Sequence, residues 1–243
     1  MTMLSMSSVI VISVGMIILL QGCSSSSQSV RNETLPRHQA THRESRQSYH
    51  PSGQDFYPIR CRGNVIDVGN PLQQITAHLE AQAIPYNSIP LSDCSGMFHR
   101  VLLMLDSTCP GNNFPTYRQQ RSTRQLAEWY HHRGNLVLVH DAMASSYLIK
   151  PGAVMFFGKR GKRYADFNAN DLFTRSRGIE HMGVVISVQE DKRGRVVSYR
   201  MFHGRKSGNI AKATTHLRHY HSKSYPAYGN GSQQWVAVAR IVN

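Results

Sequence analysis

A change in hydrophobic periodicity near residue 135 is the feature that most constrains how this chain of 243 residues can fold. Before this point, segments beginning near Asn70, Asp93 and Ser122 repeat apolar residues at the spacing of amphipathic helices. After it, the period becomes that of β-strands, in segments 136–140, 153–157, 182–188, 196–202 and 235–242. This order predicts an α+β domain with N-terminal helices packed on an antiparallel β-sheet.

The second predicted helix places a cysteine in its first turn. Ser92 or Asp93 can cap this helix, so that Cys94 lies at its N-terminus. The positive end of the helix dipole favours a thiolate there, and we expect it to lower the pKa of Cys94. The pattern therefore predicts a reactive thiol.

A hairpin brings two histidines together. The turn Glu190-Asp191-Lys192-Arg193-Gly194 separates two β-rich segments, which predicts that these strands are antiparallel neighbours. If the hairpin is centred on Lys192, paired residues have numbers that sum to about 384, and His181 and His203 meet this condition. Directly opposed residues share a face of the sheet, so the two imidazoles should interact.

These residues fit the roles of a cysteine nucleophile and its partners. A histidine beside the thiol accepts its proton, and a third polar group holds that histidine in one tautomer. Cys94, His181 and His203 match these roles in that order. The alternative is that Cys94 is a small buried hydrophobe and that the histidines are solvated.

The first 22 residues predict an export signal. Residues 1–22 contain no charged side chain, and the apolar core is shorter than the roughly 20 apolar residues that span a bilayer. The sequence Leu20-Gln21-Gly22-Cys23 resembles the lipobox of bacterial lipoproteins, which implies a lipid on Cys23 and a membrane-anchored envelope protein. With Ser24 next, a host with two membranes would place it in the outer membrane, facing the periplasm. Plain secretion or an uncleaved anchor, with Cys23 unmodified, is the alternative.

Residues 23–55 are polar and basic with little apolar periodicity, which predicts a disordered tether. Residues 56–243 suit one domain.

The net charge of +14 indicates a polyanionic partner. Because an exported chain does not routinely meet nucleic acid, anionic envelope polymers are the better candidates; the alternative is that the basic residues only keep the surface soluble.

Two further cysteines and a histidine cluster remain. An oxidising compartment permits Cys61 and Cys109 to form a disulfide, although two free thiols stay possible. The histidines lack the carboxylate or cysteine spacing of a metal site, so we expect no metal and no cofactor there. We interpret this segment as a basic, partly solvated loop near the cleft. The cluster comprises His216, His219 and His221, with His131 and His132.

Five motifs carry a resemblance to a known family. Asp93-Cys94-Ser95-Gly96 is similar to the catalytic signature of the NlpC-type cell-wall peptidases, a papain-like family. Four more matches follow in the family's order, and the resemblance covers about residues 84–242. They are Arg121-Ser122-Thr123-Arg124-Gln125, Lys150 to Phe157, Glu180-His181-Met182-Gly183-Val184-Val185-Ile186, and Phe202-His203-Gly204.

The resemblance implies a peptidoglycan hydrolase that cleaves stem peptides between γ-D-glutamate and the diamino acid. It makes Cys94 the nucleophile, His181 the general base and acid, and His203 the orienting residue. Tyr86 resembles the tyrosine that helps to line the substrate site. Asp93 and Ser95 flank the nucleophile and are substrate-binding candidates. The backbone N–H of Cys94 is an expected oxyanion donor.

This sequence also departs from the family pattern. The segment between Tyr86 and Cys94 is short and lacks the Trp-Gly-Gly element, and Ala153 stands where the family often has Asp. Basic insertions occupy residues 109–120 and 159–179. A catalytically silent scaffold or wall-binding protein of the same fold is therefore the alternative function.

Overall fold

The computed structural model describes residues 58–217, 220–222 and 224–242. The predicted signal (1–22), the predicted tether (23–55) and Cys23 lie outside the described residues. Among the helices that are described, none has the length and hydropathy needed to cross a membrane.

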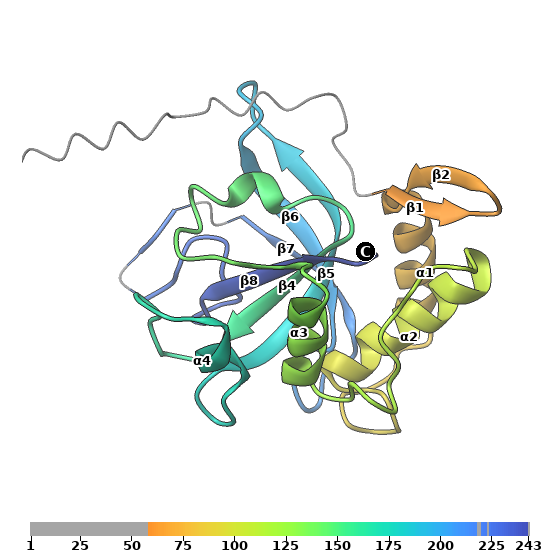
Figure 1. The fold of residues 1–243 in the computed structure, drawn as a ribbon, viewed down its shortest axis with the longest axis horizontal. Helices are drawn as coiled ribbons and strands as arrows, with labels where there is room; N and C mark the ends of the chain where they lie inside the picture. Colours follow the sequence, from red (N-terminus) through yellow and green to blue (C-terminus); the bar gives the residue numbers. More distant parts are fainter. Residues whose placement is uncertain (1–57, 218–219, 223, 243) are drawn as a thin grey trace, which may run out of the picture. The chain divides into compact units, whose positions relative to one another are not determined.

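A six-stranded antiparallel sheet forms the centre of the domain, in the order β3-β8-β4-β5-β6-β7 (Figure 1). A separate antiparallel hairpin precedes the first helix. The predicted α+β class with an antiparallel sheet is confirmed. The sheet strands are β3 (Leu136–Leu138), β4 (Ala153–Gly158), β5 (Ile179–Glu190), β6 (Val196–His203), β7 (Lys212–His216) and β8 (Trp235–Arg240); the hairpin is β1 (Pro58–Cys61) and β2 (Asn64–Asp67).

The three predicted helices are present, and side chains fix where two of them begin. They are α1 (Gly69–Ala81), α2 (Cys94–Thr108) and α3 (Thr123–His132). Asp93 caps α2, and Ser122 caps α3 in a capping box with Gln125. Cys94 is therefore the first residue of its helix, as predicted.

The sequence prediction included the three residues of β3 but missed several short elements. These are the hairpin β1–β2, strand β7, the helix α4 (Ala169–Phe173) and a 3-10 turn, η1 (Ser146–Leu148). Each has five residues or fewer, too few to establish a hydrophobic period. Strand β7, of sequence KATTH, also lacks large apolar side chains because it lies at the edge of the sheet.

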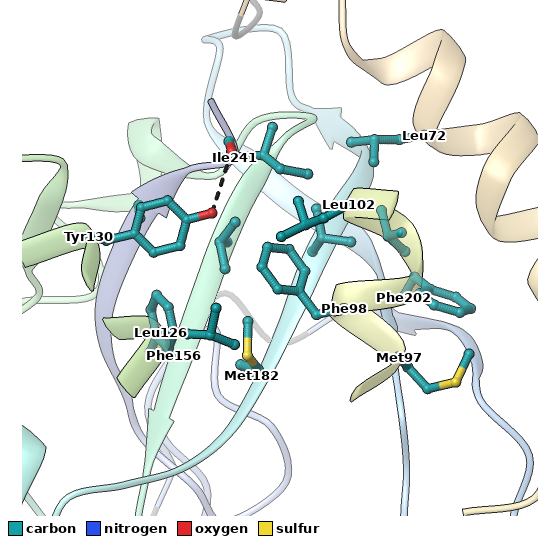
Figure 2. Packing of buried hydrophobic residues seen from close by; sticks show 14 of the residues in the cluster. Leu72, Met97, Phe98, Leu102, Leu126, Tyr130, Phe156, Met182, Phe202 and Ile241 are labelled. Atoms are coloured by element: carbon teal, nitrogen blue, oxygen red, sulfur yellow. Dashed lines mark hydrogen bonds between the residues drawn. The ribbon is translucent and has the colours of Figure 1, made fainter. Parts of the chain in front are cut away.

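Both faces of the sheet are buried. Along β4, Val154 and Phe156 join the core beneath the helices, whereas Met155 and Phe157 join a second core on the other face. On the helical side, the apolar residues of α2 and α3 converge with those of β4 and β5 (Figure 2). The Tyr130 hydroxyl donates to the Ile241 carbonyl at 3.4 Å, so this core satisfies its polar atom.

The register of the β5–β6 hairpin differs from the prediction by two residues. Val184 pairs with Phe202, and Val185 with Met201, so paired numbers sum to 386 rather than 384 near the site. A β-bulge after Val185 contributes to the irregularity. His181 and His203 are therefore diagonal, not directly opposed. An even shift leaves both on one face, and their imidazoles still meet.

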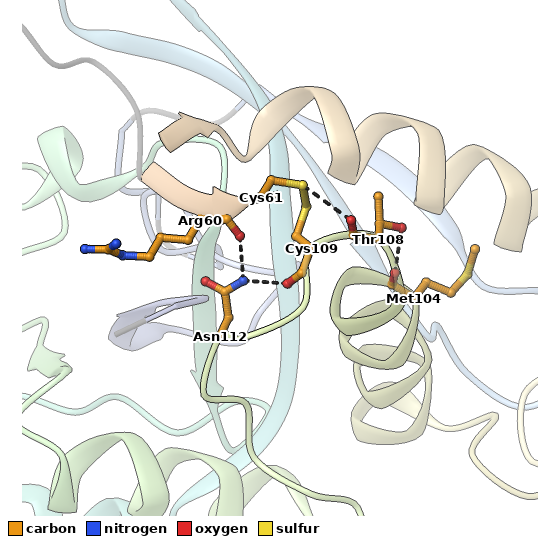
Figure 3. Close-up of a disulfide and its surroundings, with 6 residues drawn as sticks. All are labelled: Arg60, Cys61, Met104, Thr108, Cys109 and Asn112. Atoms are coloured by element: carbon orange, nitrogen blue, oxygen red, sulfur yellow. Dashed lines mark hydrogen bonds between the residues drawn. A yellow bond between two sulfur atoms is a disulfide. The ribbon is translucent and has the colours of Figure 1, made fainter. Parts of the chain in front are cut away.

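A disulfide between Cys61 and Cys109 ties the hairpin to the end of α2 (Figure 3). Asn112 reinforces this junction, because its Nδ2 donates to the carbonyls of Arg60 at 2.8 Å and Cys109 at 2.6 Å. The cysteines are separated by 48 residues. The cross-link thus closes a long loop around α1 and α2.

We expect the double variant Cys61→Ser, Cys109→Ser to lower the free energy of unfolding by about 2–4 kcal/mol, because the unfolded chain regains the entropy of that loop. Urea denaturation at neutral pH measures the change. Reductant should destabilise the wild type to a similar extent and leave the variant unaffected. An unchanged unfolding midpoint and slope would show that the cross-link does not constrain the unfolded state.

Candidate active site

Cys94 is fixed where α2 meets the end of β6. The Asp93 side chain accepts the backbone N–H of Gly96 at 2.7 Å and so holds the first turn. Gly204 lies directly behind it: a Cβ there would come within 2.8 Å of the Asp93 carbonyl carbon and 2.9 Å of the Cys94 nitrogen. Only glycine permits this approach, which determines the position of the thiol relative to the sheet.

Polar groups from three other segments surround the thiol. The Cys94 sulfur lies 3.5 Å from the Thr123 hydroxyl, and the backbone N–H of Met182 in β5 donates toward it. The Tyr86 hydroxyl accepts from the Cys94 backbone N–H and donates toward its sulfur. The nucleophile candidate is thus buried, with 7% of its surface exposed, among hydrogen-bonding partners.

His181 and His203 form a hydrogen-bonded pair. His181 Nε2 lies 2.8 Å from His203 Nδ1, and the rings are roughly perpendicular, with centroids 5.0 Å apart. Both side chains are buried. Because its Nε2 is engaged by His203, the nitrogen of His181 that remains for another partner is Nδ1. Met182 follows His181 directly in β5, so the backbone group that donates to Cys94 is adjacent in the strand to the histidine pair.

Asp93 and Ser95 are held by an arginine. Arg121 makes a bidentate ion pair with Asp93, with Nη1–Oδ1 and Nη2–Oδ2 distances of 3.0 and 3.1 Å. Its Nη1 also donates to the Ser95 hydroxyl at 3.0 Å. The two predicted substrate-binding residues therefore belong to one network, which leaves the Asp93 carboxylate paired rather than free.

An open pocket of about 490 Å³ lies over this network. It is lined by all three predicted substrate-binding residues and by Cys94, whereas His181 and His203 are not among its lining residues. The remaining lining residues come from α3, the two residues before it and the start of β5. The full lining is Tyr86, Asp93, Cys94, Ser95, Arg121, Ser122, Thr123, Arg124, Ile179 and Glu180.

Burial determines the protonation of the site. It raises the pKa of the Cys94 thiol, against the direction that we expected from the helix N-terminus, and the Asp93 carboxylate adds to the rise. Burial also lowers the pKa of His181 to about 4, with smaller contributions from His216 and Arg160. The expectation of a depressed thiol pKa is corrected: desolvation is the largest contribution to the pKa of Cys94 and raises it, so the neutral thiol and imidazole are favoured at rest.

The histidine cluster is arranged differently from our expectation. His216 ends strand β7, and its Nε2 lies 2.9 Å from the Thr214 hydroxyl, so this residue is not in a solvated loop. His221 Nδ1 accepts the backbone N–H of Ala227 at 3.2 Å, and His219 lies outside the described residues. In the described part of the chain, no group of three or more His, Cys, Asp or Glu side chains could hold a metal ion.

Sequence reasoning missed several contributors to the site. Thr123, the Met182 backbone N–H, Thr214 and His216 all touch the thiol or extend the histidine pair. The motif Arg121-Ser122-Thr123-Arg124-Gln125 could have indicated that Thr123 lies at the site. Nothing in the sequence indicated Thr214, because strand β7 itself was not predicted.

Comparison with known proteins gives no match for this chain, whether with protein-family models, with curated proteins or with solved structures. The chemistry of the site is therefore inferred from the geometry around Cys94 and from the sequence motifs.

We expect the stability of the protein to fall as the pH is lowered from about 6.5 to about 4. Burial lowers the pKa of His181 and His216 to about 4, so in this window the unfolded state binds protons that the folded state does not. Each such histidine contributes a slope of about 1.4 kcal/mol per pH unit.

Urea denaturation at several pH values tests this dependence. Replacing His181 by Phe should reduce the slope of the free energy of unfolding against pH by the contribution of one histidine, about 1.4 kcal/mol per pH unit. The matched control His78→Gln, on the exposed side of α1, should keep the wild-type slope. Stability that stays constant across this window would contradict the burial of neutral histidines.

Proposed function

We propose that this protein is a cysteine peptidase of the papain-like, NlpC-type fold that cleaves peptidoglycan stem peptides. The observation that carries the proposal is that Cys94, at a capped helix start, receives a hydrogen bond from the backbone N–H of Met182, the residue next to the buried His181 that pairs with His203. Five ordered sequence motifs support the substrate class, and the α+β architecture is compatible with it.

In the proposed first step, the Cys94 thiol gives its proton to His181 Nδ1 as the sulfur attacks an amide carbonyl carbon. His203 keeps Nε2 of His181 occupied, which leaves Nδ1 to accept the proton. The Thr123 hydroxyl and the Met182 N–H stabilise the developing thiolate. Because the resting pair is neutral, proton transfer accompanies attack, rather than preceding it.

The tetrahedral intermediate carries a negative oxygen, for which two donors are at hand. The backbone N–H of Cys94 donates to the Tyr86 oxygen at rest, and in the proposed step the oxyanion replaces that oxygen as its acceptor; the rotatable Tyr86 O–H is the second donor. Burial, with Cys94 and Asp93 nearby, raises the pKa of Tyr86 to about 12, so its hydroxyl stays protonated and able to donate.

The intermediate collapses when His181 returns the proton to the leaving amine nitrogen and the C–N bond breaks. A thioester on Cys94 remains. Water, deprotonated by His181, then attacks the thioester carbon, and the products are a free carboxylate and the regenerated thiol. No cofactor takes part in this cycle. The scissile bond that we propose lies between γ-D-glutamate and the diamino acid.

The exposed cations of residues 159–179 could bind anionic groups of the substrate or of envelope polymers. In the described part of the chain the only ion pairs are Arg121–Asp93 and Arg195–Asp191, so the exposed cations of the insertion 159–179 have no carboxylate partner. We propose that they contact carboxylates of the substrate or other anionic envelope polymers. A lipid on Cys23 would hold the protein at the bacterial membrane, in the outer membrane facing the periplasm of a two-membrane host.

The second candidate is a catalytically silent envelope scaffold or wall-binding protein. The burial of the site favours this second candidate. Burial raises the pKa of the Cys94 thiol and lowers the pKa of His181, and both shifts disfavour a thiolate–imidazolium ion pair. The short segment between Tyr86 and Cys94 favours it too. Such a protein would use the pocket beside Arg121 for binding alone.

Digestion of purified peptidoglycan tests the first candidate. We expect new termini at the γ-D-glutamyl bond, detected by mass analysis of muropeptides, and a rate loss of about 10³-fold or more in Cys94→Ala, since the covalent route is lost. His78→Gln should retain the wild-type rate. Unchanged muropeptides with folded protein and a reduced Cys94 would contradict the peptidase.

Alkylation of Cys94 across pH tests its protonation state. We expect the free protein to react slowly at pH 7 and faster as the pH rises, because burial raises the pKa of this thiol. Thr123→Val should raise the midpoint further, since a donor to the thiolate is removed. Rapid alkylation already at pH 6 would instead indicate a preformed thiolate–imidazolium pair.

A further inference from the structure

The hydrogen bonds of the histidine pair continue beyond His203. Its Nε2 lies 2.8 Å from the Thr214 hydroxyl, which in turn lies 2.9 Å from His216 Nε2. With the 2.8 Å contact between His181 and His203, three imidazoles and one hydroxyl form a continuous chain. Strands β5, β6 and β7 supply its members.

The backbone of Gly229 favours one direction for these hydrogen bonds. His216 makes a hydrogen bond to the backbone of Gly229 that favours the charged imidazole, so the imidazole N–H donates and the carbonyl accepts. Because Nε2 of His216 faces Thr214, the donor to Gly229 is Nδ1. A neutral imidazole has one donor and one acceptor, so Nε2 of His216 must accept from Thr214.

The same alternation determines every later bond. The Thr214 hydroxyl donates to His216 and therefore accepts from His203 Nε2–H. His203 Nδ1 then accepts from His181 Nε2–H. His181 is left with a lone pair on Nδ1, the nitrogen that the proposed mechanism uses to take the Cys94 proton.

Packing keeps this chain ordered and neutral. The Tyr199 ring stacks on His216 with centroids 4.8 Å apart and planes 7° apart, and Tyr199 pairs with His216 across β6 and β7. Burial lowers the pKa of all three histidines. The charged groups near them, Arg160 beside His181 and Arg205 beside His203, disfavour protonation further.

We propose that Thr214 and His216 are positioning residues that hold His181 in its Nε2–H tautomer, ready to act as a general base. This inference rests on the proposed peptidase function for its purpose, but the tautomer itself is independent of activity. A protonated His216 would donate from both nitrogens and would remove the acceptor that sets the direction.

Three variants of the full chain on β7 test the proposal. Thr214→Val removes the hydroxyl at nearly constant shape and should lower kcat for peptidoglycan fragments about tenfold or more, with KM little changed. Thr214→Ser keeps the hydroxyl and should restore most of kcat. Thr215→Val, the same change at the adjacent exposed position, should match the wild type. A Thr214→Val enzyme with wild-type kcat would overturn the proposal.

Nitrogen-15 NMR of the imidazoles separates this inference from the proposed function. We expect the wild type at pH 7 to show His181 as the Nε2–H tautomer, and Thr214→Val to show a tautomer mixture. That result supports the inference even if no muropeptide is cut, in which case the peptidase proposal alone fails. An unchanged His181 tautomer in Thr214→Val overturns the inference even if the enzyme is active.

A second variant guards against misfolding of Thr214→Val. His216→Phe retains an aromatic ring to stack on Tyr199 but has no nitrogen to accept from Thr214. It should give the same loss of kcat and the same tautomer mixture. Retention of the single His181 tautomer in this variant would also overturn the proposal.

Discussion

The close approach of α2 to the end of β6 is the contact on which the site depends. Gly204 brings the backbone of β6 against Asp93 and Cys94, and Gly96 allows the loop at Leu91 to pack on the first helical turn. A side chain at either glycine would push the helix away from the sheet. Because the helix supplies the sulfur and the sheet supplies the imidazoles, this contact sets their relative position.

The sequence predicted the parts of the site that have a strong local pattern. The Asp93 cap fixed the first residue of α2, and the β5–β6 hairpin brought His181 near His203 although the register was wrong by two residues. Because a shift of two residues keeps both side chains on the same face of the sheet, the predicted contact between the two histidines is present despite the wrong register. Thr214 could not be predicted, because the position of an edge strand depends on pairing with β6 and not on its own apolar period.

The burial that orders the site also disfavours the charged forms of Cys94 and His181. It raises the pKa of Cys94 and lowers that of His181, and in both cases desolvation is the largest contribution. The one ion pair at the site, Arg121–Asp93, lies at the more exposed rim, where solvation makes charge less costly. In the proposed mechanism, proton transfer between the neutral Cys94 thiol and the neutral His181 imidazole then depends on the orientation of the imidazole lone pair, because no charge attraction draws the two groups together.

The basic insertion contributes to this balance from outside the core. Tyr164 fastens it, since its hydroxyl accepts from the Lys159 N–H at 2.9 Å and contacts the carbonyls of Arg177 and Gly178. The fastening holds Arg160 near enough to disfavour a charge on His181. Under the proposed function, residues 159–179 would therefore act in two ways: their cations would contact anionic polymers, and Arg160, by helping to keep His181 neutral, would preserve the lone pair that accepts the thiol proton.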